Sequence, residues 1–134
     1  MGEYYRMDTR LLEPDVLYVS LPPEPLLRPQ LTQLREHLPQ MGDKHMVLDL
    51  SHVEIISSPS IGSLLLLQKQ LAQRGRRLML YGTRLATRCI FRVAGLDTLL
   101  EFAEEKSEAI TAADVHKWLE RGSRSGQSCE GRRK

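Results

Sequence analysis

Short apolar runs alternate with amphipathic stretches through the second half of the chain, and few folds accommodate this pattern. The runs at 46–50 and 78–81 are almost entirely apolar, which is typical of strands buried on both faces. The stretches at 61–74 and 84–94 have apolar residues at helical spacing and end at Gly75 and Gly95. Strands that alternate with helices pair in parallel through right-handed crossovers. The pattern therefore predicts an α/β fold.

The first half of the chain predicts a hairpin at one edge of that sheet. Residues 5–12 and 16–21 read as strands around a turn at 13–15. Four prolines between positions 22 and 29 break the pattern and are expected to exclude a helix until about Leu31. A short helix then ends near Pro39. With Thr83 as the cap of the 84–94 helix, a strand at 99–102 and a last helix at 105–120, we expect a mixed four- to five-stranded β-sheet and about four α-helices.

Composition and charge indicate one folded unit followed by a basic tail. The chain has 134 residues, of which 41% are hydrophobic and 27% charged, as in an ordinary globular protein. Five basic residues and one acid give residues 121–134 a net charge of +4, so the formal +2 leaves −2 for residues 1–120. We expect a single domain over 1–120 and a disordered Gly/Ser-rich tail over 121–134. The mildly acidic domain predicts no direct nucleic-acid partner.

Several functional classes find no support in the sequence. The longest apolar run, 64–67, is too short for membrane insertion, and the first residues do not form a secretory signal, so a cytoplasmic location is expected. Two cysteines and four histidines lack metal-ligand spacing. The chain contains none of the common nucleotide-binding or hydrolase motifs. We therefore expect no catalytic residues, no metal and no cofactor.

The most informative segment begins at Ser58. Serine is a preferred N-cap and proline is favoured at the first helical position, so Ser58 followed by Pro59 predicts a helix start. A Ser58 hydroxyl that accepts from the N–H of Ser60 or Ile61 would contribute about 0.5–2 kcal/mol. A phosphate on Ser58 would meet the same free amides and the positive end of the helix dipole. Ser58 is thus either a simple cap or a phosphorylation site.

The helix after Ser58 carries more apolar residues than one buried face requires. One core stripe is expected at helical spacing, and Leu66 and Leu67 widen it; the stripe comprises Ile61, Leu64, Leu65 and Leu71 with Ala72. The helix either lies deep in the protein or keeps an apolar strip for a partner.

The next helix has two distinct stripes. Arg84, Arg88 and Arg92 recur at intervals of four, and such a stripe is either solvated or pairs electrostatically with an acidic partner or with a phosphate on Ser58. The opposite stripe is expected to face the core, with a buried cysteine; it comprises Leu85, Cys89, Val93 and Leu96. Asp49, at the end of a buried run, is interpreted as a structural carboxylate that accepts from loop N–H groups.

Residues 47–64, 71–80 and 88–100 together resemble the STAS domain, the module shared by sulphate transporters and bacterial anti-sigma factor antagonists. The resemblance implies the STAS-like (SpoIIAA-like) fold and a non-enzymatic protein that binds an anti-sigma factor of the serine kinase type. In the phosphorylated branch of the family the loop reads Asp-Ser-Ser-Gly, and its second residue, the acceptor, falls on Ser58. The unphosphorylated protein there captures the anti-sigma factor, and phosphorylation reverses the capture.

The chain departs from that motif at three positions: Ser57 replaces Asp, Pro59 replaces Ser and Ser60 replaces Gly. The switch at Ser58 is therefore intact, altered or lost, and Ser57 and Ser60 are less favoured acceptors. The alternative is an unphosphorylated STAS scaffold subunit of an ABC-type transport complex or of a sensory assembly. For the regulatory protein we expect a monomer or weak homodimer whose partner-binding residues are Ser57, Ser58, Pro59, Ser60, Ile61, Gly62 and Leu66.

Overall fold

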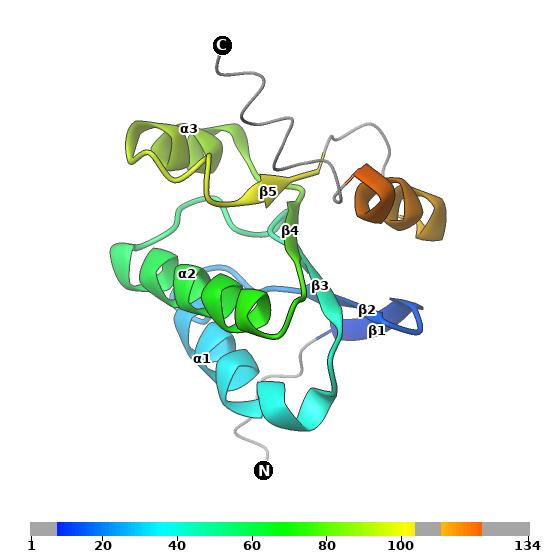
Figure 1. Ribbon diagram of the computed structural model, residues 1–134. Helices are drawn as coiled ribbons and strands as arrows, with labels where there is room; N and C mark the ends of the chain where they lie inside the picture. The colour runs from blue at the N-terminus through cyan, green and yellow to red at the C-terminus, as the bar shows by residue number, and fades with distance from the viewer. Residues whose placement is uncertain (1–7, 104–110, 122–134) are drawn as a thin grey trace.

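A mixed five-stranded sheet forms the centre of the computed structural model, which describes residues 8–103 and 111–121 (Figure 1). The strands lie in chain order, β1-β2-β3-β4-β5. β1 and β2 are antiparallel, and each later strand pairs in parallel with the one before it. The α/β fold with an N-terminal hairpin is thus confirmed. The strands are β1 (Asp8–Glu13), β2 (Val16–Ser20), β3 (His45–Asp49), β4 (Leu78–Tyr81) and β5 (Glu101–Phe102).

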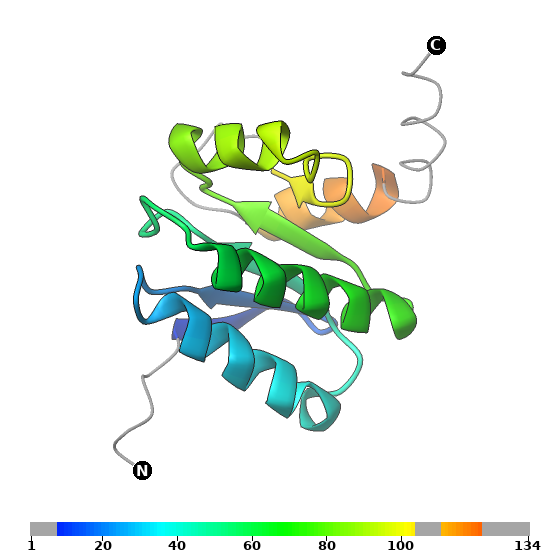
Figure 2. The same ribbon diagram turned by 90° about the vertical axis from the view of Figure 1, so that its left-hand side faces the viewer.

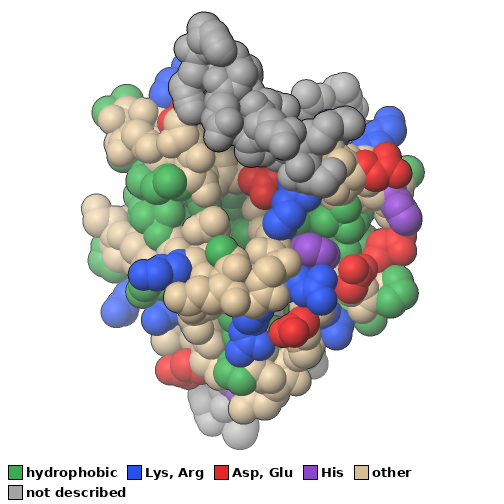
Figure 3. Space-filling model, in the orientation of Figure 1, with side chains coloured by type: hydrophobic (Ala, Val, Ile, Leu, Met, Phe, Trp, Pro, Cys, Tyr) green, Lys and Arg blue, Asp and Glu red, His purple; other side chains and the backbone are tan. Residues whose placement is uncertain are grey.

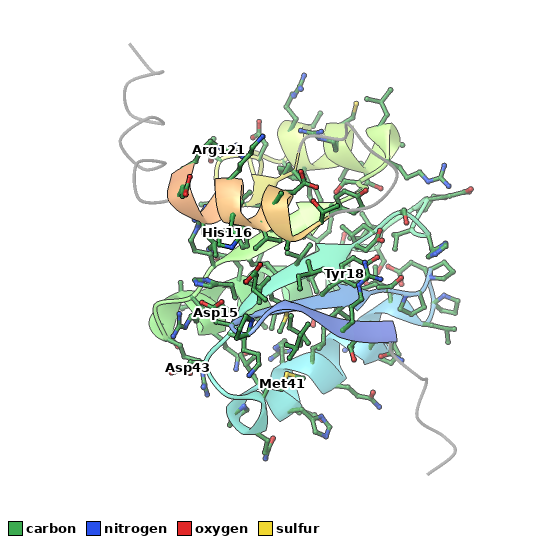
Figure 4. All side chains as sticks on the ribbon, turned by 90° about the vertical axis from the view of Figure 1, so that its right-hand side faces the viewer. Asp15, Tyr18, Met41, Asp43, His116 and Arg121 are labelled. Atoms are coloured by element: carbon green, nitrogen blue, oxygen red, sulfur yellow. The ribbon has the colours of Figure 1, made fainter. Side chains whose placement is uncertain are left out.

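Helices cover both faces of the sheet. One face carries α1 (Leu27–His37), α2 (Ser58–Gln73) and α3 (Leu85–Val93), with the 3₁₀ helix η1 (Leu38–Met41) after α1 (Figure 2). A helix over residues 112–121 lies on the opposite face, which Figure 4 shows with His116 on this helix and Tyr18 on β2. The starts of α2 and α3 both follow the carboxyl ends of parallel strands, so these two starts lie at the same edge of the sheet (Figure 2).

Strand alternation divides the core into two layers. In β4, Leu78 and Leu80 join the larger cluster under α1 and α2, whereas Met79 and Tyr81 join a smaller cluster with Trp118 of the opposite helix. The period of two residues along a strand explains why nearly continuous apolar runs are needed in β3 and β4. These two strands, buried on both faces, provide the rigid base from which the loops at the carboxyl edge project.

The Pro-rich connection was expected to delay the first helix to Leu31, and that prediction is wrong. α1 begins at Leu27, so Pro29 lies in its first turn. The N–H groups of a first turn have no intrahelical partner, and a proline there breaks no helical hydrogen bond.

The predicted orientation of α3 is also wrong. Leu85 and Val93 are 78% and 88% exposed, and Cys89 is exposed, whereas the buried residues of α3 are Thr87 and Phe91. Of the predicted stripe, Leu96, beyond the end of α3, packs against the larger core cluster. α3 lies beside the two-residue strand β5, where Phe91 contacts Phe102 at 5.8 Å between ring centroids. A helix at the edge of the sheet has little surface to cover, so one aromatic ring fills the space and the longer apolar stripe faces solvent.

The cap predicted for this helix is wrong as well. Arg84, with extended backbone, is the N-cap of α3 and makes no side-chain cap bond. The Thr83 hydroxyl is instead buried without a hydrogen-bond partner. The expectations for the tail over 122–134, and for the part of the last helix at 105–110, fall outside the described residues. No helix among the described residues is long and apolar enough to cross a membrane.

Candidate functional site

The start of α2 is capped by Ser57. Its backbone is extended (φ −87°, ψ 160°), and its Oγ accepts a 3.3 Å hydrogen bond from the Ser60 N–H. The prediction that Ser58 is the cap is therefore wrong by one residue. Pro59 takes the second helical position, where a missing N–H costs no helical bond, so a Ser-Pro pair does not by itself determine which serine is the cap.

This shift turns the three serines in different directions. Ser60 is fully buried, and its Oγ accepts a 3.1 Å hydrogen bond from the Ser57 hydroxyl. Ser57 is half-buried, whereas Ser58 and Pro59 are exposed. Of the three candidate acceptors, Ser58 is thus the one with a solvent-exposed side chain.

A carboxylate from a distant segment completes the cap. Glu24, in the connection between β2 and α1, accepts a 2.9 Å hydrogen bond from the Ser57 N–H, and the hydroxyls of Ser60 and Ser57 also lie in hydrogen-bond reach of it. Partial burial raises the pKa of Glu24, but the hydrogen bonds from Ser60 and Ser57 outweigh it and hold the pKa below its ordinary value. Sequence analysis missed Glu24, whose one distinguishing signal is its place among the prolines at 22, 23 and 25.

Beyond the cap, α2 presents a narrow outward edge. Ser58, Gly62 and Leu66 recur at intervals of four and are exposed, with Leu66 at 47%. A Cβ added at Gly62 would meet nothing within 4 Å, so the helix backbone is open to a partner there. We call Ser58, Pro59, Gly62 and Leu66 the α2 ridge. Ile61 lies on the inner side, where it packs against the larger core cluster.

Apolar side chains also reach the surface between α2 and α3, where Figure 3 shows hydrophobic side chains gathered. Ile55, in the loop before α2, is 73% exposed, and Leu85 begins the outward stripe of α3. The Thr87 hydroxyl donates to the Glu54 carbonyl at 3.5 Å, which joins this loop to α3. The loop before α2 and the start of α3 therefore each carry an exposed apolar side chain.

The arginine stripe of α3 has mixed roles. Arg84 donates from Nε to the Ser51 carbonyl at 3.2 Å and lies 3.9 Å from the Glu54 carboxylate. Arg88 stacks 4.8 Å from the centre of the Phe102 ring, and Arg92 is exposed. Arg84 thus holds the loop before α2. Pairing of this stripe with a phosphate stays a prediction.

Asp49 has the structural role that its position in the sequence suggested. Its Oδ1 accepts from the Ser51 N–H at 2.9 Å, and its Oδ2 accepts from the Tyr18 hydroxyl. A side chain at Gly82 would approach Asp49 Oδ1 to 3.0 Å, and Gly82 also has a φ of +71°. Within 8–103 and 111–121, no three His, Cys, Asp or Glu side chains gather as a metal site.

A family model described as "Mlab, STAS domain" matches residues 26–101, more than half of the chain. The chain belongs to the STAS domain family. The match includes all of α1, α2 and α3 and therefore the whole α2 ridge. No curated protein matches the chain.

Solved STAS structures share the fold at low identity. The S58E variant of RsbS from Moorella thermoacetica aligns with a TM-score of 0.65 and 20% identity over 87% of this chain and 99% of its own. An anti-sigma-factor antagonist (STAS) domain protein from Planctomyces limnophilus gives 0.63 and 16%, over 75% and 91%. Phosphorylated SpoIIAA from Bacillus gives 0.57 and 14%, over 75% and 93%. These likenesses establish the fold of this STAS chain.

Proposed function

We propose that this STAS chain is a non-catalytic regulatory protein that binds an anti-sigma factor of the serine kinase type through the α2 ridge. The observation that carries the proposal is the outward row of Ser58, Gly62 and Leu66 at the start of α2. An exposed leucine beside an open backbone position gives a partner both an apolar anchor and close access to the helix. Structural likeness to anti-sigma factor antagonists supports this class of partner.

Modification of Ser58 would act on the centre of this surface. A phosphate adds about −1.5 to −2 charges at neutral pH. A partner packed on the ridge would then bury an uncompensated charge, and a loss of about 2.7 kcal/mol corresponds to a hundredfold weaker complex.

The test is a titration with the anti-sigma kinase encoded nearest to this chain in its genome. Leu66→Glu should weaken binding at least tenfold because it places a charge at the apolar anchor, and Ser58→Asp should weaken binding while Ser58→Ala preserves it. The matched control is Ala72→Glu, an exposed change that adds the same charge on the same helix, away from the ridge. Incubation with ATP followed by mass spectrometry determines whether Ser58 gains a phosphate. Wild-type affinity for both Leu66→Glu and Ser58→Asp would refute the ridge as the contact surface.

A second candidate is an unphosphorylated scaffold subunit that binds the ATPase of a membrane transport complex. Two observations favour it: three residues around Ser58 depart from the phosphorylated family motif, and Glu24 already places a carboxylate at this helix start. Co-purification with a transport ATPase, together with loss of that complex in Leu66→Glu and no phosphate on Ser58, would support this candidate over the first.

A further inference from the structure

The N-terminus of α2 already holds an anion. Glu24 lies 33 residues before Ser57 in the chain, yet its carboxylate accepts from the Ser57 N–H at 2.9 Å. A negative charge therefore reaches this helix start from the connection between β2 and α1.

The backbone donors around Ser58 are nearly all used. Among residues 57–61, the N–H of Ser57 donates to Glu24, that of Ser60 to Ser57 Oγ and that of Ile61 to the Ser57 carbonyl. Pro59 has no N–H, which leaves Ser58 itself as the remaining donor. The expectation that a phosphate on Ser58 would meet several free amides is therefore wrong. A second anion would find one amide there, and the Glu24 carboxylate is already bound to the N–H of the neighbouring Ser57.

We propose that Glu24 is a positioning residue, an internal anion that fixes the start of the α2 ridge and opposes a second negative charge at Ser58. The inference deepens the proposed function, since it concerns regulation of the same ridge. Like charges at close range disfavour each other's ionised form, and the helix dipole that would welcome one anion is already compensated. Without modification, Glu24 then gives the start of the ridge a fixed negative charge. A phosphate on Ser58 lowers the stability of the fold more here than in a chain that lacks Glu24.

A double-mutant cycle on the free chain tests this coupling. Ser58→Glu and Glu24→Gln are made singly and together, and the unfolding equilibrium constant is measured in urea at pH 7. Ser58→Glu should raise that constant about threefold to tenfold more in the wild-type background than in Glu24→Gln, as expected for two charges at a partly exposed site. The matched control is Glu36→Gln, an exposed acid on α1. An equal effect of Ser58→Glu in all three backgrounds would overturn the proposal.

A second measurement remains valid if Glu24→Gln fails to fold. NMR titration of the Glu24 carboxyl in the Ser58→Glu variant should show a pKa above that in the wild type, a change that a purely structural Glu24 would not produce. An unchanged pKa would overturn the proposal. Both experiments use the chain alone, so their failure is distinct from failure of the ridge to bind a partner. If Glu24 and Ser58→Glu are coupled in the free chain but Leu66→Glu binds the partner as the wild type does, the role of Glu24 is supported and the proposed function is refuted.

Discussion

Substitutions at Gly62 should change the stability of the fold and the affinity for a partner in opposite directions. Glycine in a helix interior is about 0.8–1.0 kcal/mol less favourable than alanine, and a Cβ at this position meets open space. Gly62→Ala should therefore raise the free energy of unfolding by about 1 kcal/mol. With about 2.1 cal/mol/K of unfolding entropy per residue, this corresponds to a Tm increase of roughly 3–4 °C. Urea unfolding should give a higher midpoint at an unchanged m-value.

The same position should react in the opposite way in a binding assay. Gly62→Gln keeps a better helix former than glycine but extends a side chain from the centre of the α2 ridge. We expect stability at or above that of the wild type together with at least tenfold weaker binding of the anti-sigma kinase, a loss of about 1.4 kcal/mol. Ala72→Gln, an exposed change on the same helix, is the control and should leave affinity unchanged. A lower Tm for Gly62→Ala would refute the open surroundings of Gly62, and unchanged affinity for Gly62→Gln would refute its place in the contact.

Three further predictions concern the fold around the site. Phe91→Ala should lower the free energy of unfolding by about 3–5 kcal/mol because it empties the buried side of α3. Leu85→Ser should lower it by less than about 0.5 kcal/mol, and thermal melts measure both. A larger loss for Leu85→Ser than for Phe91→Ala would support the orientation predicted from the sequence. Burial and the nearby arginines hold the pKa of His45 below its ordinary 6.5, and its Nδ1 accepts from the Arg77 N–H, so the unfolded chain binds the proton more readily. Stability should then be full above about pH 6.5 and fall as the pH drops toward the folded pKa, with a shallower fall in His45→Asn; identical pH profiles for the two proteins would contradict this. Trp118→Ala should cost about 3–5 kcal/mol and speed amide exchange over residues 112–121, and unchanged exchange there would show that the helix does not depend on its ring.

Local sequence signals identified the elements but not always their orientation. The run at 46–50 determined a buried strand because few other structures bury five consecutive residues, and β3 (His45–Asp49) covers most of that run. The apolar stripe of α3 was equally regular and yet faces solvent, because periodicity shows that a helix has two faces and does not show which face the sheet covers.

The candidate site shows the same division at the level of single residues. That α2 begins near Ser58 follows from Ser and Pro, whose preferences act within one helical turn. Those preferences did not determine which serine caps the helix; the cap is Ser57, whose N–H donates to Glu24, a residue 33 positions earlier in the chain.

The amino-acid sequence alone determined the order of strands and helices and the family resemblance, because each depends on local spacing or on residue types in a row. Tertiary structure decided which side of α3 is buried, which serine of the α2 start is exposed and that the Glu24 carboxylate binds the N–H of the α2 cap. Those properties arise from contacts between segments far apart in the chain, and hydrogen bonding and burial at such contacts are set by packing rather than by local preference.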